Sequence, residues 1–166
     1  MIKILIASSA DLKEEREQCI HLVNQFNDSH KDMVLKPTEW DYDMMHAHLP
    51  ERNTSPDEVS VKLADSDVLV LLLSSKISTQ TLLVFRYAVK QKEMMIWVLY
   101  NSDIKDALYS SESFNDILIV HSSSPERLRI LPYKDLRNLG FIFKVSLYDP
   151  AIAYTARSFK PGRKYD

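Results

Sequence analysis

Three short apolar runs, separated by segments with helical spacing, restrict the folds that this chain can adopt. The runs are residues 2–7, 67–73 and 94–99. Each run is too brief to span a membrane and is nearly continuous in apolar residues, as in a parallel strand that helices cover on both faces. Strands that alternate with helices are joined by right-handed crossovers. The pattern predicts a three-layer, flavodoxin-like α/β domain with a mainly parallel central sheet and helices on both faces.

The segments between the runs carry helix signals and one further strand. Apolar residues recur on one helical face over residues 12–27, and Asp11 with Glu14 is expected to cap that helix. Pro37 cannot donate a hydrogen bond to a neighbouring strand, which places the short strand expected at residues 34–40 at a sheet edge. The other expected elements are helices over residues 56–64, 81–91, 104–109 and 132–138, and strands over residues 117–120 and 142–147.

Composition narrows the function classes. At 166 residues the chain fits one domain, expected over residues 1–150 and followed by a basic, partly disordered tail, residues 151–166. Lysine and arginine number 21 against 23 acidic residues, so the net charge of −2 offers no field to hold a nucleic acid. One cysteine, Cys19, permits no internal disulfide, and no membrane partner is expected, which favours a cytoplasmic protein. The two glycines, Gly140 and Gly162, are too few for a glycine-rich phosphate loop.

The first hundred residues also carry motifs of a known family. The segment ILIASSADLKEEREQ is followed by LKPTEWDYD, SPDEVSVKLADSDVLVLLL and SKISTQTLLVFRYAVKQ. Together they resemble the TIR-like domains of unknown function in bacteria, which open with the motif ASS-x-(D/E)-L-K-E-x-R-E. The resemblance covers residues 2–100, and its first motif is the specific one. The matching positions are Ser8, Ser9, Asp11, Leu12, Glu15 and Arg16 in that motif, then Trp40, Asp41 and Asp67.

The resemblance implies a TIR-like fold and a role in signalling or interaction, in bacterial defence or stress responses. In active TIR domains a glutamate on the helix after the central strand is the catalytic residue that cleaves the glycosidic bond of NAD. The corresponding stretch here is residues 81–88, TLLVFRYA, with Val84 near the position of that glutamate. A carboxylate is needed there to stabilise the positive charge that develops on the ribose as the bond breaks. The sequence therefore predicts a degenerate catalytic pocket without a cofactor, which keeps at most NAD or another nucleotide as a ligand.

The turn after the first strand is the first candidate site. Ser8, Ser9 and Asp11 lie at a helix N-terminus, where free amides and the helix dipole favour an anion. They are expected either to cap the helix alone or to contact a ligand such as a ribose phosphate as well. Arg16, one turn further along, would reach the same phosphate or pair with a carboxylate after the second strand, such as Asp41.

Two further candidate sites lie at the ends of later strands. Trp40, Asp41 and Asp43 would form either a stacking surface with acceptors for ribose hydroxyls, or a core tryptophan beside a solvated acidic turn. Ser74, with Ser75, ends the central strand and is a ligand-binding candidate, because ligands of such sheets bind outside the carboxyl ends of the strands.

Three reactive side chains are expected to be structural. Cys19 has no evident activating partner and should pack in the core. His46 and His48 lack the further ligands that a metal site needs, so no metal is expected.

Two hypotheses of different class follow. The leading one is an interaction domain with a degenerate pocket that works through self-association or a protein partner. The alternative is a hydrolase of N-glycosidic bonds in NAD or nucleosides, with a non-standard carboxylate. Glu39 and Asp41 are the catalytic candidates of this alternative, and Asp11 and Asp43 are further carboxylates within reach of the same edge.

Overall fold

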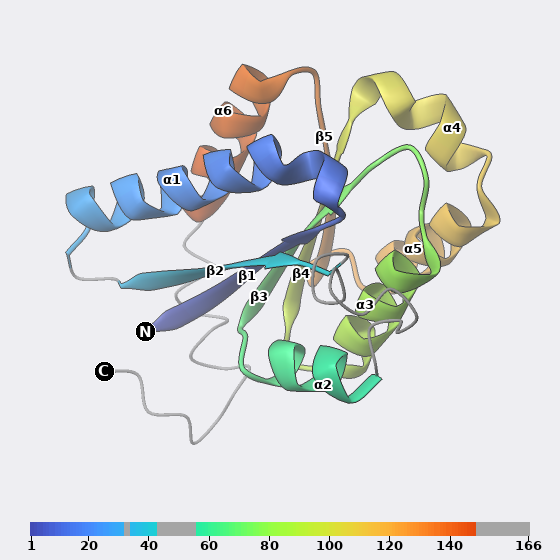
Figure 1. Ribbon diagram of the computed structural model, residues 1–166, viewed down its shortest axis with the longest axis horizontal. Helices are drawn as coiled ribbons and strands as arrows, with labels where there is room; N and C mark the ends of the chain where they lie inside the picture. Colours follow the sequence, from blue (N-terminus) through green and yellow to red (C-terminus); the bar gives the residue numbers. More distant parts are fainter. Residues whose placement is uncertain (32–33, 43–55, 149–166) are drawn as a thin grey trace.

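Five strands form a parallel sheet at the centre of the molecule. The structure, a computed structural model, describes residues 1–31, 34–42 and 56–148 (Figure 1). Within these residues the strand order is β2-β1-β3-β4-β5, which is the doubly wound order of flavodoxin-like folds. The strands are β1 (Ile2–Ser8), β2 (Leu35–Asp41), β3 (Val68–Leu73), β4 (Met95–Asn101) and β5 (Leu128–Tyr133).

Helices cover both faces of this sheet, so the predicted three-layer α/β architecture is confirmed (Figure 1). One face carries two helices and the other carries three, with a short helical segment after β4. The first group is α1 (Lys13–Ser29), entered through the 3-10 turn η1 (Ala10–Leu12), and α6 (Leu136–Leu147); the second is α2 (Pro56–Ala64), α3 (Thr79–Lys90) and α5 (Glu112–Ser123); η3 (Ser102–Ile104) leads into α4 (Lys105–Tyr109).

Alternation along each strand divides the core into two layers. In β1, Ile4 and Ile6 pack with α1 and α6, whereas Leu5 and Ala7 pack with the helices of the opposite face. Successive side chains of a strand point to opposite faces, so a strand buried on both sides must be apolar at every position. This requirement explains why the apolar runs predicted β1, β3 and β4 correctly. Strand β2 lies at the sheet edge, as Pro37 predicted.

The expectations for the last third of the chain were wrong in three places. Residues 117–120 belong to α5 and not to a strand, and Ile117 packs inward one turn after Phe114. Residues 132–138 contain the end of β5 and the start of α6, and residues 142–147 are helical. Short apolar runs do not distinguish a strand from a buried helix. In residues 136–147 the buried residues Leu139 and Phe143 are four positions apart, which is the spacing of one helix face.

The cap of α6 sets where strand β5 gives way to helix. The side chain of Asp135 accepts a hydrogen bond from the backbone nitrogen of Asn138 at 2.8 Å. The side chain of Asn138 in turn accepts one from the backbone nitrogen of Lys134 at 2.8 Å. These reciprocal bonds satisfy amides that a helix N-terminus leaves free, so α6 begins directly after the strand. In the described part of the chain, no helix has both the length and the apolar character that crossing a membrane requires.

Candidate functional site

The carboxyl ends of the strands meet at one edge of the sheet and bring the candidate residues together. Strand β1 lies between β2 and β3. The connection that follows β1 leads to β2 on one side of it, and the connection that follows β2 leads to β3 on the other side. Such a topological switch point opens a crevice where ligands of doubly wound sheets bind. Ser8 ends β1, Asp41 ends β2, and Ser74 directly follows β3.

Arg16 fills the part of this edge that lies over β1 and β2. Its side chain comes from α1 and is buried. Nη1 donates to Oγ of Ser8, and it also donates to the carbonyl oxygen of Ser9 at 2.7 Å. Nε donates to Oε1 of Glu39 at 3.1 Å, and Nη2 contacts Oδ2 of Asp41 at 3.5 Å. The guanidinium is therefore held by protein groups on all sides, which is the structural alternative expected for Arg16.

The turn after β1 is closed on itself. Oγ of Ser9 donates to Oδ1 of Asp11, and Oγ of Ser8 donates to the carbonyl oxygen of Ser9 at 2.7 Å. The expected cap formed by Asp11 with Glu14 was wrong, because neither η1 nor α1 has a side-chain hydrogen bond at its N-terminus. The physical reason is the 3-10 turn, which places Asp11 inside the first turn instead of before it.

Trp40 belongs to the core, which is the structural one of the two alternatives predicted for this residue. Its side chain is buried and packs edge-on against Tyr42, with 5.9 Å between the ring centroids. Alternation along β2 sends Trp40 to the face opposite Arg16. The hydroxyl of Tyr42 shares a 2.7 Å hydrogen bond with Oγ1 of Thr81 on α3. Asp43, with His46 and His48, lies outside the described residues.

Val84, the position to which the resemblance assigns the catalytic glutamate, is part of the core. Val84 of α3 is fully buried and packs with Leu71 and Ala88 in the layer beneath the sheet. A side chain at this position points to the sheet and not to the edge where the strands end. Glu39 and Asp41, the carboxylates of the hydrolase hypothesis, are both paired with Arg16.

A cavity of about 230 Å³ lies at the same edge, over β3, β4 and β5. Ser74 is one of its residues, and its Oγ donates to the carbonyl oxygen of Lys76 at 3.1 Å. Two carboxylates contribute to the lining, and no described lining residue is basic. The lining residues are Asp11, Leu12, Glu15, Leu73, Ser74, Ser75, Asn101, Ile104 and Tyr133.

Sequence reasoning missed three polar residues of this cavity. Glu15 was a motif match only, whereas Asn101 and Tyr133 were not considered. Asn101 and Tyr133 end β4 and β5, so their position at the carboxyl end of a strand was the signal that could have found them. Tyr133 falls in the helix predicted over residues 132–138, which hid this signal.

Cys19 behaves as a core residue. It is fully buried, and burial together with the negative charge of Glu15 raises the pKa of its thiol. The thiolate is the nucleophilic form of cysteine, so this environment opposes reactivity. Among residues 1–31, 34–42 and 56–148, no cluster of three or more His, Cys, Asp or Glu side chains is arranged to hold a metal ion.

Comparison with known proteins adds no assignment. No protein-family model matches this chain, and no curated protein matches it.

Proposed function

We propose that this chain is a TIR-like signalling or interaction domain that self-associates through the outer face of α6. A stripe of exposed apolar residues on α6 and at its C-cap carries the proposal. Phe141, Val145 and Tyr148 are 68%, 55% and 47% exposed and follow each other at helical spacing. Large apolar side chains gathered on one helix face mark interaction surfaces in folded proteins.

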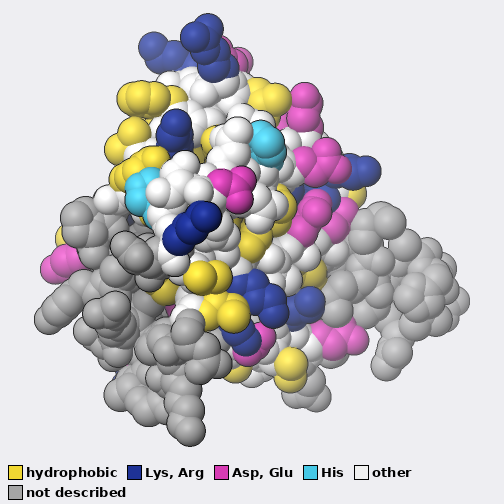
Figure 2. Space-filling model, turned by 90° about the vertical axis from the view of Figure 1, so that its left-hand side faces the viewer, with side chains coloured by type: hydrophobic (Ala, Val, Ile, Leu, Met, Phe, Trp, Pro, Cys, Tyr) yellow, Lys and Arg dark blue, Asp and Glu magenta, His cyan; other side chains and the backbone are white. Residues whose placement is uncertain are grey.

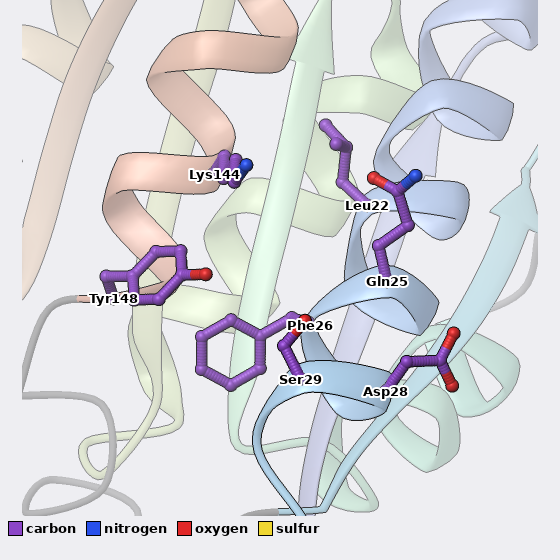
Figure 3. A pocket seen from close by; sticks show the side chains of 7 residues that line it. All are labelled: Leu22, Gln25, Phe26, Asp28, Ser29, Lys144 and Tyr148. Carbon is purple, nitrogen blue, oxygen red and sulfur yellow. The ribbon is translucent and has the colours of Figure 1, made fainter.

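The surface beside this stripe is suited to a second copy. A hollow of about 340 Å³ separates α6 from the C-terminal half of α1. Figure 3 shows Tyr148 and Lys144 on the α6 side and Phe26 with Asp28 on the α1 side. Figure 2 is turned by 90° from Figure 1 about the vertical axis. On the face that it shows, apolar side chains reach the surface among charged ones.

Charge supports pairing between identical copies. A two-fold interface brings each residue against a different residue of the same patch, so the patch must complement itself. The hollow carries the cation of Lys144 and the anion of Asp28 on opposite sides. In a two-fold pair these charges meet across the interface at its rim, while the α6 stripes pack at its centre.

The pairing of the candidate carboxylates favours interaction over chemistry. Val84 stands in the core where the related glutamate would act, and Arg16 engages both Glu39 and Asp41. The proposed role in bacterial defence or stress responses rests on the resemblance of residues 2–100 to TIR-like domains. Nucleotide binding stays a prediction, and the cavity at the strand ends has no basic group in its described lining to attract a phosphate.

Sedimentation velocity across a wide concentration range tests self-association. Phe141→Glu and Val145→Glu place a charge in the stripe and should weaken association at least tenfold, because burying an unpaired charge is unfavourable. Ile119→Glu is the matched control, since Ile119 is 58% exposed on α5, away from α6. A strictly monomeric wild-type protein, or equal effects of all three variants, contradicts the proposal.

One observation keeps the hydrolase as a second candidate. The side chain of Glu39 is 41% exposed at the strand ends, so its carboxylate is accessible to a ligand although Arg16 contacts it. Assays of NAD and nucleosides with wild type, Glu39→Gln and Asp41→Asn test this candidate. Turnover that both variants abolish supports it, and no turnover at micromolar enzyme removes it.

A further inference from the structure

Tyr133 lines the cavity over β3, β4 and β5 and is only 3% exposed. Among the described residues, its hydroxyl has no hydrogen-bond partner. Within those residues, the one side-chain polar atom that is both sealed from solvent and unpartnered is Nε1 of Trp97. The Tyr133 hydroxyl is therefore not sealed, and the cavity that Tyr133 lines is a space from which a ligand can approach it. A buried tyrosine ring with a free hydroxyl leaves a hydrogen bond for a ligand to make.

Donors and acceptors alternate around this hydroxyl. Burial, with the negative charge of Glu15, raises the pKa of Tyr133, so its hydroxyl stays a donor at neutral pH. Oδ1 of Asn101 accepts a hydrogen bond from the backbone nitrogen of Asp103 at 2.9 Å. The side-chain NH₂ of Asn101 is therefore the group that stays available, and it is a donor. Glu15 makes no hydrogen bond or ion pair with a described residue, and its carboxylate offers acceptors.

The charge of the cavity limits the ligand. Asp11 and Glu15 give the described lining a negative charge, which repels a phosphate. An amine would satisfy the carboxylates, but it would leave the donors of Tyr133 and Asn101 facing another donor. A hydroxyl serves both needs, because it donates to a carboxylate and accepts from a tyrosine or an amide.

The size of the cavity limits the ligand further. Its volume of about 230 Å³ is below the range of roughly 300–1,000 Å³ that holds drug-sized molecules. We infer that this cavity binds a small uncharged ring with several hydroxyls, of the monosaccharide class and without phosphate, through Glu15, Asn101 and Tyr133. The site lies at the strand ends and not on the outer face of α6, so it goes beyond the proposed self-association and is tested separately from it.

NMR titration of the full chain with D-ribose and D-glucose, each beside its phosphate ester, tests the inference. We expect the free sugar to shift the backbone amides of Ser75, Ser102 and Lys134, and the phosphate ester to bind more weakly. Tyr133→Phe removes a hydroxyl without a protein partner, so it should keep the fold and weaken sugar binding about fivefold, the effect of one hydrogen bond. Tyr87→Phe is the matched control, because it removes one hydroxyl on α3, outside the cavity.

A second variant separates the two polar roles. Glu15→Gln keeps the size of the side chain and exchanges an acceptor for a donor, so it should weaken sugar binding and relieve the repulsion of the phosphate ester. Three results overturn the inference: no amide shift at this edge with either sugar, tighter binding of the phosphate ester by wild type, or equal sugar affinity of wild type and Tyr133→Phe. Because the readout is local, a monomeric protein that binds the sugar contradicts only the proposed self-association.

Discussion

Nε of Arg16 donates a 3.1 Å hydrogen bond to Oε1 of Glu39, and this contact joins α1 to the edge strand β2. Strand β2 pairs only with β1, so it depends more than the inner strands on contacts made by side chains. The same guanidinium contacts Ser8 at the end of β1 and Asp41 at the end of β2. Arg16 thus ties the carboxyl ends of two neighbouring strands to one helix.

Replacing Arg16 should be strongly destabilising. Arg16→Met keeps the aliphatic stem but removes the cation that the largely buried carboxylate of Asp41 and the hydroxyl of Ser8 contact. Breaking a buried ion pair by removing one partner is unfavourable by about 3 kcal/mol. Urea unfolding measures the change. Arg86→Met is the control, because both side chains of the Arg86–Asp116 pair are exposed. This variant should lower the free energy of unfolding by less than about 1 kcal/mol. Equal losses for the two variants would contradict a special role of Arg16.

Arg16 also shows where prediction from sequence succeeds and where it stops. The apolar runs predicted β1, β3 and β4 because a strand covered on both faces has no polar positions. Arg16 shares the helical face of Leu12 and Cys19, but a charged residue in that position indicates burial only when its partners are known. Those partners come from β2, more than twenty positions away in the chain.

The last third of the chain lacks the signal that the first hundred residues carry. Strand β5 is the last in the sheet order, and only Leu128 and Tyr133 of its residues are buried, so it has no continuous apolar run. The apolar run in α5 contains Ile117 and resembles a buried strand more than β5 does. The cavity residues Asn101 and Tyr133 could not be grouped from sequence, because grouping them requires the strand order.

Arg127 holds the C-terminal end of α3, which gives a second prediction. Its Nε donates to the carbonyl oxygen of Met94 at 2.7 Å, and its Nη2 donates to those of Ala88 and Val89 at 3.0 Å and to that of Gln91. A helix leaves its last carbonyls unpaired, and a cation there also complements the helix dipole. Burial lowers the pKa of Arg127, but the group stays charged.

Arg127→Met should therefore destabilise the fold by about 2–3 kcal/mol, since buried carbonyls lose charged donors. Hydrogen exchange should show the loss first at the amides of α3 and of the start of β4. Arg129→Met serves as the control on the neighbouring strand. Unchanged hydrogen exchange of the α3 amides in the Arg127→Met variant would contradict the role of Arg127 in holding the end of α3.

Placing a carboxylate at Val84 should not create an enzyme. Val84→Glu places an ionisable group in a fully buried position, and Leu71 and Ala88 of its core layer offer no polar side-chain partner. Burying this carboxylate without partners should be unfavourable by several kcal/mol. The midpoint temperature of thermal unfolding should therefore fall strongly, or the protein should not fold. Leu83→Glu, one position earlier and half-buried, should be tolerated better. A stable Val84→Glu protein that cleaves NAD would contradict the position of Val84 in the core.

The buried thiol of Cys19 predicts how stability falls in alkali. Burial and Glu15 raise its pKa, so the native state keeps a proton that the unfolded chain loses above its ordinary pKa of about 8.5. The stabilisation that the protonated thiol contributes to the native state is fully present below about pH 8.5 and is lost as the pH rises toward the pKa of the folded state. Between pH 9 and 10 wild type should lose about 1 kcal/mol more than Cys19→Ala. Urea unfolding at both pH values checks this, and parallel losses would show that the thiol does not titrate with unfolding.

Gly140 predicts how closely α1 and α6 can approach. A methyl group at Gly140 would lie 2.9 Å from Nε2 of Gln18 and 3.6 Å from Cδ1 of Leu22. The Gln18 amide is the end of a flexible side chain and can move, whereas alanine favours a helix over glycine by about 1 kcal/mol. Gly140→Ala should therefore be neutral to slightly stabilising. Gly140→Val should destabilise, because its branches press on Leu22 and the helices must separate. In a double-mutant cycle, Gln18→Ala should make Gly140→Ala clearly stabilising, and full additivity would mean that the amide is not the limiting contact.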